Sequence, residues 1–452
     1  MMDLVNNSSK FTGTGIIALW VAACESHQRP DLCLCSDIIM INSTSSNLKS
    51  PTRYSYATHL VCTDCGKEYS IDEINTYCLD CQAPLFTVYD LKNLRQDFKR
   101  EDFTERKWGM WCWHELLPVR SAANAITLGE GDAPLLQLPN LGMELGLSNL
   151  FVKDESTNPT GSFKARGISA AISKAKELGI NKVIIPTAGN AGGAMAAYAA
   201  RARLKAHIFM PKDTPMANIQ ESRMAGAEVV LIDGLISEAA GMAGIKARAE
   251  GWFDLSTFKE PYRVEGKKIM GYELAEAFGW TLPDVIIYPT GGGTGLVGMW
   301  KAFAELEELG WLDNTKRPRM VAVQAEGCAP VVKAFEAHAS FCDFWINAHT
   351  VASGLRVPKS FADHIILQNI YDSKGIALSV SDEAILAAQR QLGKEEGIFA
   401  APEGAATLAG LISLIEKGWA RPDERIVLFN TGSGLKYINN LAGSEPAGTT
   451  AG

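Results

Sequence analysis

A lysine in a short loop of small polar residues is the first feature of this sequence that suggests chemistry. Lys164 stands in residues 158–166, NPTGSFKAR, where a turn leads into a stretch that reads as a helix. Exposed N–H groups and a partly dry pocket favour the neutral amine, and a neutral amine is the form that makes a Schiff base with a carbonyl group. A lone lysine is most often a solvated surface side chain, so this interpretation depends on its neighbours.

Two further loops follow predicted strands, where parallel sheets bind their ligands. Residues 291–295 read GGGTG between a strand and a helix, and residues 187–190 read TAGN in a similar setting. Consecutive backbone N–H groups at a helix start bind anions such as phosphate. A glycine-rich turn also fits a dinucleotide site, but the spacing here is not G-x-G-x-x-G and no acidic residue stands at the expected offset.

Four cysteines form two CxxC pairs with metal-ligand spacing. Cys62 and Cys65 make the first pair, and Cys78 and Cys81 make the second after twelve intervening residues. Each CxxC turn points two thiolates at one ion, and two turns complete the tetrahedral sulfur set of a structural Zn²⁺ site. The segment is too short for a core of its own, so a metal would supply stability. The alternative is a metal-free ribbon that folds by docking on the main body. The other six cysteines form no comparable set.

The elements that must position these loops alternate between strand and helix. From about residue 126, short continuous apolar runs alternate with long alanine-rich stretches. Continuous apolar runs indicate parallel sheets that helices cover on both faces, so the expected fold class is α/β. We expect strands at residues 183–185, 207–210, 229–232, 285–288, 321–323 and 426–429.

Length, composition and charge exclude several classes of function. The 452 residues are 47% hydrophobic and 21% charged, which is typical of a globular chain and not of a coiled coil or a disordered protein. The net charge of −8 provides no basic surface for nucleic acid. No apolar run approaches a membrane span, and the apolar residues 13–24 follow too little positive charge for a signal peptide. We therefore expect a cytoplasmic protein with no membrane or nucleic-acid partner. We also expect a flexible extension over residues 1–59, in which Met40 is an alternative start.

Longer strings connect the three loops to a known family. They are AITLGEGDAPLL, KDESTNPTGSFKARG, AGNAGGAMAAYAARA, EPYRVEG, DVIIYPTGGGTGLVGMWKAF, PEGAATLAGL and NTGSGLK. In this order they resemble the fold-type II pyridoxal-phosphate enzymes, and the threonine synthase family most closely, over about residues 60–436. The resemblance implies pyridoxal 5'-phosphate as cofactor. It also implies a two-domain α/β fold similar to that of the tryptophan synthase β subunit, with an N-terminal zinc-ribbon-like segment.

The resemblance also implies roles for individual residues. Lys164 would be the catalytic residue that forms the Schiff base with the cofactor and then carries protons, with Phe163 packed nearby. Asn190 would hydrogen-bond to the ring hydroxyl. Thr431, or Ser433 as second candidate, would face the pyridine nitrogen, where a neutral hydroxyl favours elimination over transamination. The loop that would hold the cofactor phosphate consists of Gly291, Gly292, Gly293, Thr294 and Gly295.

Several positions that would bind a substrate phosphate depart from the family pattern. Ala188 stands where Ser or Thr is usual, and residues 258–260 read FKE where a Ser and an Asn are common. The usual Gln-Lys-Thr is replaced by KKI at residues 267–269. We expect Thr187, Arg263 and Lys267 to bind the substrate, because Arg and Lys bind phosphate well. The alternative for the lysine pair at residues 267–268 is a solvated helix face.

These observations predict a lyase of the threonine synthase type, which converts O-phosphohomoserine and water into L-threonine and phosphate. Its partner would be a small amino-acid substrate, and a homodimer is common in the family. The alternative is a related β-replacement or elimination enzyme, either cysteate-synthase-like or a serine/threonine dehydratase (ammonia-lyase), which the three consecutive glycines favour.

The expected divisions of the chain are a zinc-ribbon-like segment at 60–90, a helical linker at 91–125, a large cofactor-binding domain at 126–170 and 266–440, a smaller inserted α/β domain at 171–265, and a disordered tail at 441–452.

Overall fold

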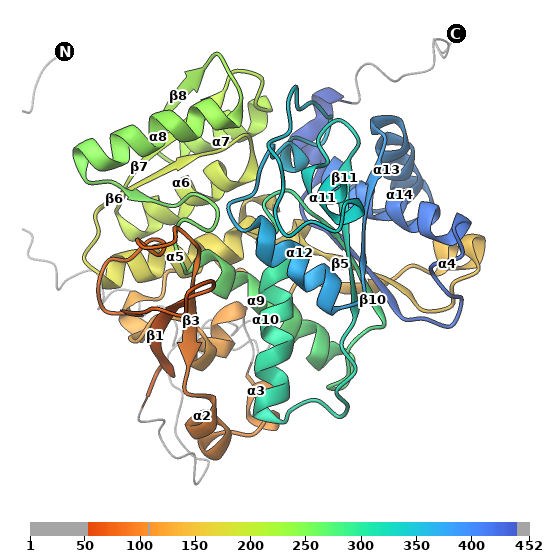
Figure 1. The fold of residues 1–452 in the computed structure, drawn as a ribbon, viewed down its shortest axis with the longest axis horizontal. Helices are drawn as coiled ribbons and strands as arrows, with labels where there is room; N and C mark the ends of the chain where they lie inside the picture. Colours follow the sequence, from red (N-terminus) through yellow and green to blue (C-terminus); the bar gives the residue numbers. More distant parts are fainter. Residues whose placement is uncertain (1–52, 107–108, 441–452) are drawn as a thin grey trace, which may run out of the picture. The chain divides into compact units, whose positions relative to one another are not determined.

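The computed structural model of the chain describes residues 53–106 and 109–440, which form three sheets and the helices around them (Figure 1). The predicted tail, and the predicted extension up to residue 52, lie outside the described residues. The extension was predicted to reach residue 59, and this boundary is wrong. Tyr56 and Ala57 are buried, because the first strand begins there and packs against the body.

The largest sheet has six strands in the order β12-β11-β10-β13-β5-β4. All neighbouring strands are parallel except β4, which pairs antiparallel with β5 at the edge. The predicted parallel sheet is confirmed, and the antiparallel strand at its edge, which was not predicted, is a common addition to such a sheet. The strands are β4 (Leu135–Gln137), β5 (Leu150–Asp154), β10 (Val285–Pro289), β11 (Arg319–Ala325), β12 (Ile376–Val380) and β13 (Ile426–Asn430).

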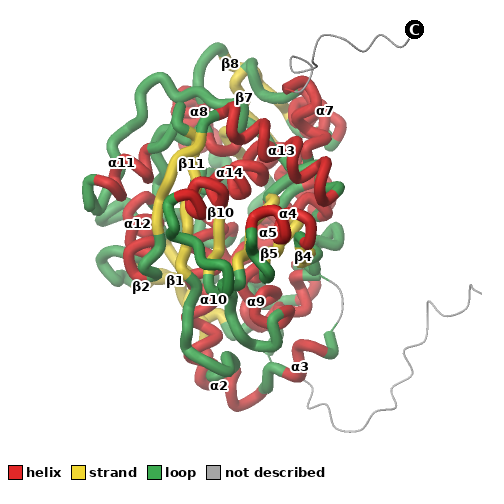
Figure 2. The backbone as a smooth tube through the Cα atoms, turned by 90° about the vertical axis from the view of Figure 1, so that its right-hand side faces the viewer, coloured by secondary structure: helices red, strands yellow, loops and turns green. Residues whose placement is uncertain are grey.

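Helices cover both faces of this sheet. Successive residues of β10 belong to two different cores: Val285 and Ile287 lie in one, and Ile286 and Tyr288 lie in the other. Such a strand is apolar at every position, as the sequence indicated. In Figure 2, α14 lies across β10 and β11. The helices on this face are α4 (Pro139–Leu145), α13 (Asp382–Glu396) and α14 (Pro402–Glu416), and those on the other are α9 (Arg263–Ala277), α10 (Thr294–Leu309) and α12 (Asp363–Asp372).

The second sheet is wholly parallel, in the order β8-β7-β6-β9. The predicted division of the chain at residues 170/171 and 265/266 stays a prediction, and both boundaries fall within helices, α5 and α9. These helices cross closely, because a Cβ added at Gly266 would lie 2.1 Å from the carbonyl oxygen of Arg166. The elements here are β6 (Lys182–Pro186), β7 (Lys205–Pro211), β8 (Glu228–Ile232), β9 (Phe253–Asp254), α5 (Lys164–Glu177), α6 (Asn190–Ala202), α7 (Met216–Met224) and α8 (Ile236–Glu250).

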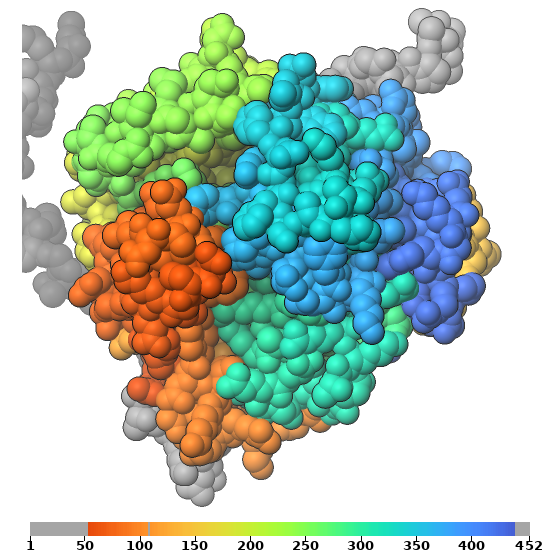
Figure 3. Space-filling model, viewed as in Figure 1, coloured from red at the N-terminus to blue at the C-terminus, as the bar shows by residue number. Residues whose placement is uncertain are grey.

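The N-terminal segment is a small antiparallel sheet in the order β2-β1-β3. Leu60, Ile71 and Leu85 share a continuous core with the rest of the fold. The Tyr77 ring also packs against the Phe361 ring, with centroids 5.6 Å apart, and Figure 3 shows the orange segment beside a blue one. The strands are β1 (Ala57–Cys62), β2 (Glu68–Ser70) and β3 (Leu85–Tyr89).

Short helices complete the fold. No helix within residues 53–106 and 109–440 has the length and hydropathy needed to cross a membrane. The short α-helices are α2 (Leu91–Asp97), α3 (Glu101–Thr104) and α11 (Pro330–Glu336), and the 3₁₀ helices are η1 (Met110–Leu116), η2 (Ala122–Asn124), η3 (Glu155–Thr157), η4 (Pro159–Gly161), η5 (Ser353–Leu355) and η6 (Gly434–Asn440).

Candidate active site

A cavity of about 270 Å³ is lined by the loops that follow β6, β10 and β13. Ligands of parallel sheets bind at these carboxyl ends of the strands. The lining includes most of the residues that the sequence singled out, but Gly295 and Lys267 are not part of it. The predicted residues that line the cavity are Phe163, Lys164, Thr187, Asn190, Arg263, Gly291, Gly292, Gly293, Thr294 and Thr431.

Lys164 is the first residue of α5, and its side chain faces the cavity. Its Nζ atom lies 4.3 Å from the centre of the Phe163 ring. Desolvation by the surrounding protein and, to a lesser degree, the nearby Arg263 charge lower the pKa of Lys164 to about 7, although Glu403 opposes both. A large fraction of this amine is therefore neutral near pH 7, which is the reactive form for Schiff-base chemistry.

Buried ion pairs hold the start of α5 in place. Arg166 is fully buried, and its Nε and Nη1 atoms lie 2.6 Å from carboxylate oxygens of Glu155 and Glu273 respectively. Lys153 of β5 lies 2.6 Å from the second oxygen of Glu273, which is on α9. The network thus ties three elements around Lys164. This network was not predicted, although charged residues inside otherwise apolar segments were a visible signal.

The glycine loop forms a cradle of backbone N–H groups at the start of α10. Within the described chain, the N–H groups of Gly291, Gly292 and Gly293 donate no hydrogen bond. Side chains would close the cradle: a Cβ on Gly291 would lie 2.2 Å from the Gly354 carbonyl oxygen, and Gly293 has a φ of +74°. Free donors at a helix N-terminus bind a phosphate group, so this loop fits the phosphate of a pyridoxal-type cofactor.

Buried polar atoms without partners surround the rest of the cavity. Asn190 Oδ1 and Glu403 Oε2 are buried and have no hydrogen-bond partner. Tyr437 links the two side chains, since its hydroxyl donates to Glu403 Oε1 at 2.9 Å and accepts from Asn190 Nδ2 at 3.4 Å. Burial raises the pKa of Glu403. Unsatisfied polar groups that converge on one cavity fit the polar ring of the same cofactor, with Thr431 also in the lining.

Glu403 and Tyr437 were not predicted as site residues. Glu403 stands within the PEGAATLAGL string that contributed to the family resemblance, so a signal was present. Tyr437 follows directly after NTGSGLK and carried no signal of its own.

Two of the cations that line the cavity, Arg263 and Lys259, differ in their partners. Arg263 is 2% exposed and donates to the Leu255 carbonyl oxygen at 2.6 Å, while its Nε atom makes no hydrogen bond and lies 4.0 Å from the Glu260 carboxylate. Lys259 has no hydrogen-bond or ion-pair partner for its ammonium group among the residues that the structure describes. It follows Phe258, whose φ of +61° is strained for a bulky residue. The cavity therefore offers positive charge that no protein carboxylate fully neutralises.

The adjacent lysines of α9 have different surroundings. Both are fully buried, so a solvated helix face is the wrong interpretation for Lys267 and Lys268. Lys268 lies 2.9 Å from Glu265 and 2.8 Å from Glu305, away from the cavity. Lys267 Nζ lies 2.5 Å from the Thr294 hydroxyl oxygen, behind the glycine loop rather than in the cavity lining.

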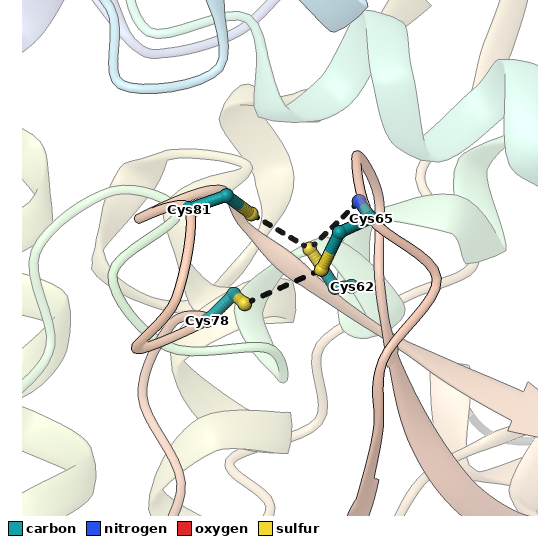
Figure 4. Close-up of side chains that lie close together, drawn as sticks. All are labelled: Cys62, Cys65, Cys78 and Cys81. Carbon is teal, nitrogen blue, oxygen red and sulfur yellow. Dashed lines mark hydrogen bonds between the residues drawn. The ribbon is translucent and has the colours of Figure 1, made fainter.

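The four cysteines of the N-terminal segment converge on one point (Figure 4). Their sulfur atoms all lie within 4.8 Å of one another, with Cys62 to Cys81 at 3.3 Å and Cys65 to Cys78 at 3.7 Å. Tetrahedral Zn²⁺ with Zn–S bonds of ~2.3 Å separates its sulfurs by roughly 3.8 Å. The Tyr69 hydroxyl donates to the Cys78 sulfur at 3.2 Å, which would stabilise a thiolate. The donor set therefore fits one Zn²⁺ ion.

Comparisons with known proteins show the family of this chain. The pyridoxal-phosphate dependent enzyme family matches residues 126–432. The chain is 36% identical over 376 residues to the threonine synthase of Methanocaldococcus jannaschii, covering 83% of this chain and 92% of the relative. It is 36% identical over 379 residues to that of Methanosarcina acetivorans, covering 84% and 92%. The chain therefore belongs to the pyridoxal-phosphate dependent enzymes and, among these, to the threonine synthase family.

Solved structures share the fold. Threonine deaminase isoform 2 from Solanum lycopersicum aligns with a TM-score of 0.57 and 25% identity, over 69% of this chain and 88% of that one. Maize serine racemase aligns with a TM-score of 0.57 and 22% identity, over 67% and 89%. The α/β fold is thus that of the fold-type II enzymes, as the sequence strings predicted.

Proposed function

We propose that this chain is a threonine synthase that converts O-phosphohomoserine and water into L-threonine and phosphate. One observation carries the proposal: the 36% identity with two archaeal threonine synthases extends over 92% of each relative. The cations at the cavity support it, because an amino acid with a phosphorylated side chain would find Lys259 and Arg263 there.

Pyridoxal 5'-phosphate, when bound, withdraws electrons from the substrate and makes the proton on Cα acidic. The N–H groups of Gly291, Gly292 and Gly293 would hold its phosphate. Asn190 would hydrogen-bond to the ring hydroxyl, and Thr431 would face the ring nitrogen. The unpartnered oxygen of Asn190 and the open glycine cradle support this assignment.

Lys164 would move the protons of the reaction. Its pKa of about 7 suits a group that must both accept and return a proton near neutral pH. Its place at the start of α5 is fixed by the Arg166 ion pairs. Lys259 and Arg263 would bind the substrate phosphate and stabilise it as a leaving group.

We also infer that Cys62, Cys65, Cys78 and Cys81 bind a structural Zn²⁺ ion. The convergence of their four sulfurs supports it. Four sulfur ligands leave no open position for a catalytic water, so the ion would stabilise the N-terminal sheet and take no part in the reaction.

Product analysis tests the proposed reaction against the related ones. The purified protein is incubated separately with O-phosphohomoserine, with phosphoserine plus sulfite, with threonine and with serine. We expect equal amounts of threonine and phosphate from O-phosphohomoserine, and no product from a Lys164→Ala variant. Cysteate, or a 2-oxo acid made from threonine or serine, without threonine synthesis would instead identify the β-replacement or dehydratase reaction. Ala188 and the triple glycine would then be the residues that favour it.

A further inference from the structure

One buried lysine near the glycine loop lacks the partner that every comparable lysine has. Within residues 53–106 and 109–440, four lysines are buried: Lys153, Lys174, Lys267 and Lys268. Lys153 pairs with Glu273, Lys174 with Glu177, and Lys268 with Glu265 and Glu305, at 2.6–2.9 Å. Lys267 has no carboxylate within ion-pair distance among these residues. Because buried charges are normally paired, its state needs an explanation.

The surroundings of Lys267 leave its Nζ atom one polar contact. That contact is the Thr294 hydroxyl at 2.5 Å, on the first residue of α10, and the Phe163 ring centre lies 4.6 Å away on another side. The charged groups that act on it are Lys164 at the start of α5, Arg263 on its own helix, and Glu260 in the preceding loop. Two cations and one carboxylate give no net compensation for a buried ammonium group.

Burial and repulsion from Lys164 and Arg263 both hold the pKa of Lys267 well below its usual value, and Glu260 opposes them only in part. Without an anion nearby the neutral amine is therefore favoured. Thr294 itself lines the cavity at the end of the glycine loop, where the free N–H groups face. A dianionic phosphate in that loop would supply the missing counter-charge next to the Thr294 hydroxyl.

We propose that Lys267 takes up a proton from solvent when the cofactor phosphate enters the glycine loop, and that the resulting ammonium group stabilises the phosphate through Thr294. The proton moves from water or buffer to Nζ, and no other bond changes. Lys267 is a positioning residue in this role. This inference depends on binding of the family's cofactor and not on the reaction proposed above. The role of Lys267 and the proposed threonine synthase reaction can therefore be disproved independently of each other.

Isothermal titration calorimetry of the full-length, cofactor-free protein tests this. The probes are pyridoxamine 5'-phosphate, which has no aldehyde to react with Lys164, and pyridoxamine, which lacks the phosphate. Titrations at pH 8 in buffers of different ionisation enthalpy count the protons taken up. The probe phosphate is already a dianion there, since its second pKa is about 6.

We expect wild-type protein to take up close to one proton more with pyridoxamine 5'-phosphate than with pyridoxamine. Lys267→Gln introduces the residue that the family resemblance places here, and it should abolish this difference. It should also weaken binding of the phosphorylated probe roughly tenfold or more, as expected for loss of a charged partner. Wild-type affinity should fall as the pH rises from 7 to 9, while that of the variant stays nearly constant.

Lys301→Gln is the matched control. Lys301 lies on α10 like Thr294, but its ammonium group pairs with Glu265 and Glu305 instead of contacting Thr294. The Lys301→Gln variant should take up as many protons on binding pyridoxamine 5'-phosphate as the wild type does. If Lys267→Gln does not fold, Lys267→Met replaces it in the same titrations. Equal phosphate-linked proton uptake in the wild type and the neutral variant would overturn the proposal, as would no such uptake in the wild type.

Discussion

The amine of Lys164 is the group whose ionisation should govern reaction with an aldehyde. Its pKa is lowered to about 7, chiefly by burial, so the reactive neutral form accumulates as the pH rises through about 7. We expect the rate constant for reaction of cofactor-free protein with pyridoxal to rise between pH 6 and 8 and then level off. Pyridoxal is used because it has no phosphate to involve Lys267. A midpoint near that of ordinary lysine, about 10.4, would contradict the structure.

Glu403 provides an internal control for this titration. Its negative charge raises the pKa of Lys164, so Glu403→Gln should shift the midpoint of the pyridoxal reaction to lower pH. No shift would show that Glu403 is neutral beside Lys164, and a shift to higher pH would show that Glu403 acts on the amine in some way other than through its charge.

Lys259 is expected to determine affinity for the anionic end of the substrate. Its ammonium group lines the cavity without a protein partner, so it is available to a phosphate. Loss of a charge-assisted hydrogen bond costs about 1.5–3 kcal/mol. Lys259→Ala should therefore raise the KM for O-phosphohomoserine by roughly 10- to 100-fold in steady-state assays of phosphate release.

An exposed cation outside the active-site cavity controls for the loss of charge. Arg248 lines only the second, neighbouring cavity, so Arg248→Ala should leave KM unchanged. If both substitutions raised KM equally, the effect of Lys259 would be long-range attraction rather than contact with the phosphate.

The strands that the sequence revealed are those whose surroundings are apolar on both sides. All six predicted strands are confirmed, and their residues are almost continuously apolar, although the edge strand β8 is only half-buried. The strand β5 was missed, because it ends in Lys153 and Asp154. These charges are satisfied by Glu273 and Asn430, which lie more than a hundred residues away in sequence. Partners so distant in sequence leave no pattern in the residues around β5 from which this strand could be predicted.

The candidate site, like the strands, could be predicted in part from the sequence. The three loops carry turn residues and glycines whose local geometry can be read from sequence, and the structure brings them to one cavity. The distinction between Lys267 and Lys268 was not predictable. Successive helix residues point about 100° apart, and only the packing of α9 against α10 decides which faces Thr294 and which faces Glu305.

The ion pairs beneath α5 should contribute strongly to stability. Nearby Arg166 and Lys153 hold the pKa of Glu273 well below its usual range. Removing one partner of a buried pair typically costs 3–5 kcal/mol, so Glu273→Gln should lower the free energy of unfolding by about that amount in urea denaturation. Because the native pKa is depressed, the stabilisation is present above the unfolded value near 4.5 and is lost as the pH falls towards 2.

The pH dependence separates this mechanism from a packing defect. The stability difference between wild type and Glu273→Gln should shrink as the pH is lowered from 5 to 3. A difference that stays constant over this range would show that lost packing, and not lost charge, causes the destabilisation.

The N-terminal sheet contacts elements that form the active-site wall. Tyr77 packs against Phe361, which lines the cavity, and the Tyr89 hydroxyl donates to Glu265 of α9 at 2.9 Å. Tyr77 lies directly before Cys78, so the proposed metal site fixes the backbone that presents this ring. The stability of the small sheet and the shape of the cavity are therefore coupled through a few aromatic contacts.

Loss of the metal should consequently affect both stability and substrate binding. Cys78→Ser removes one of four sulfur ligands, and elemental analysis should show about one Zn²⁺ per chain in the wild type and far less in the variant. We expect a lower melting temperature and a raised KM, because Tyr77 no longer supports Phe361.

Cys342→Ser is the control, since Cys342 is buried outside the cluster and should leave the metal content unchanged. A metal-free wild type that retains full stability would show that the ribbon folds by docking alone. A variant that loses zinc but keeps its KM would show instead that the Tyr77 contact does not shape the cavity.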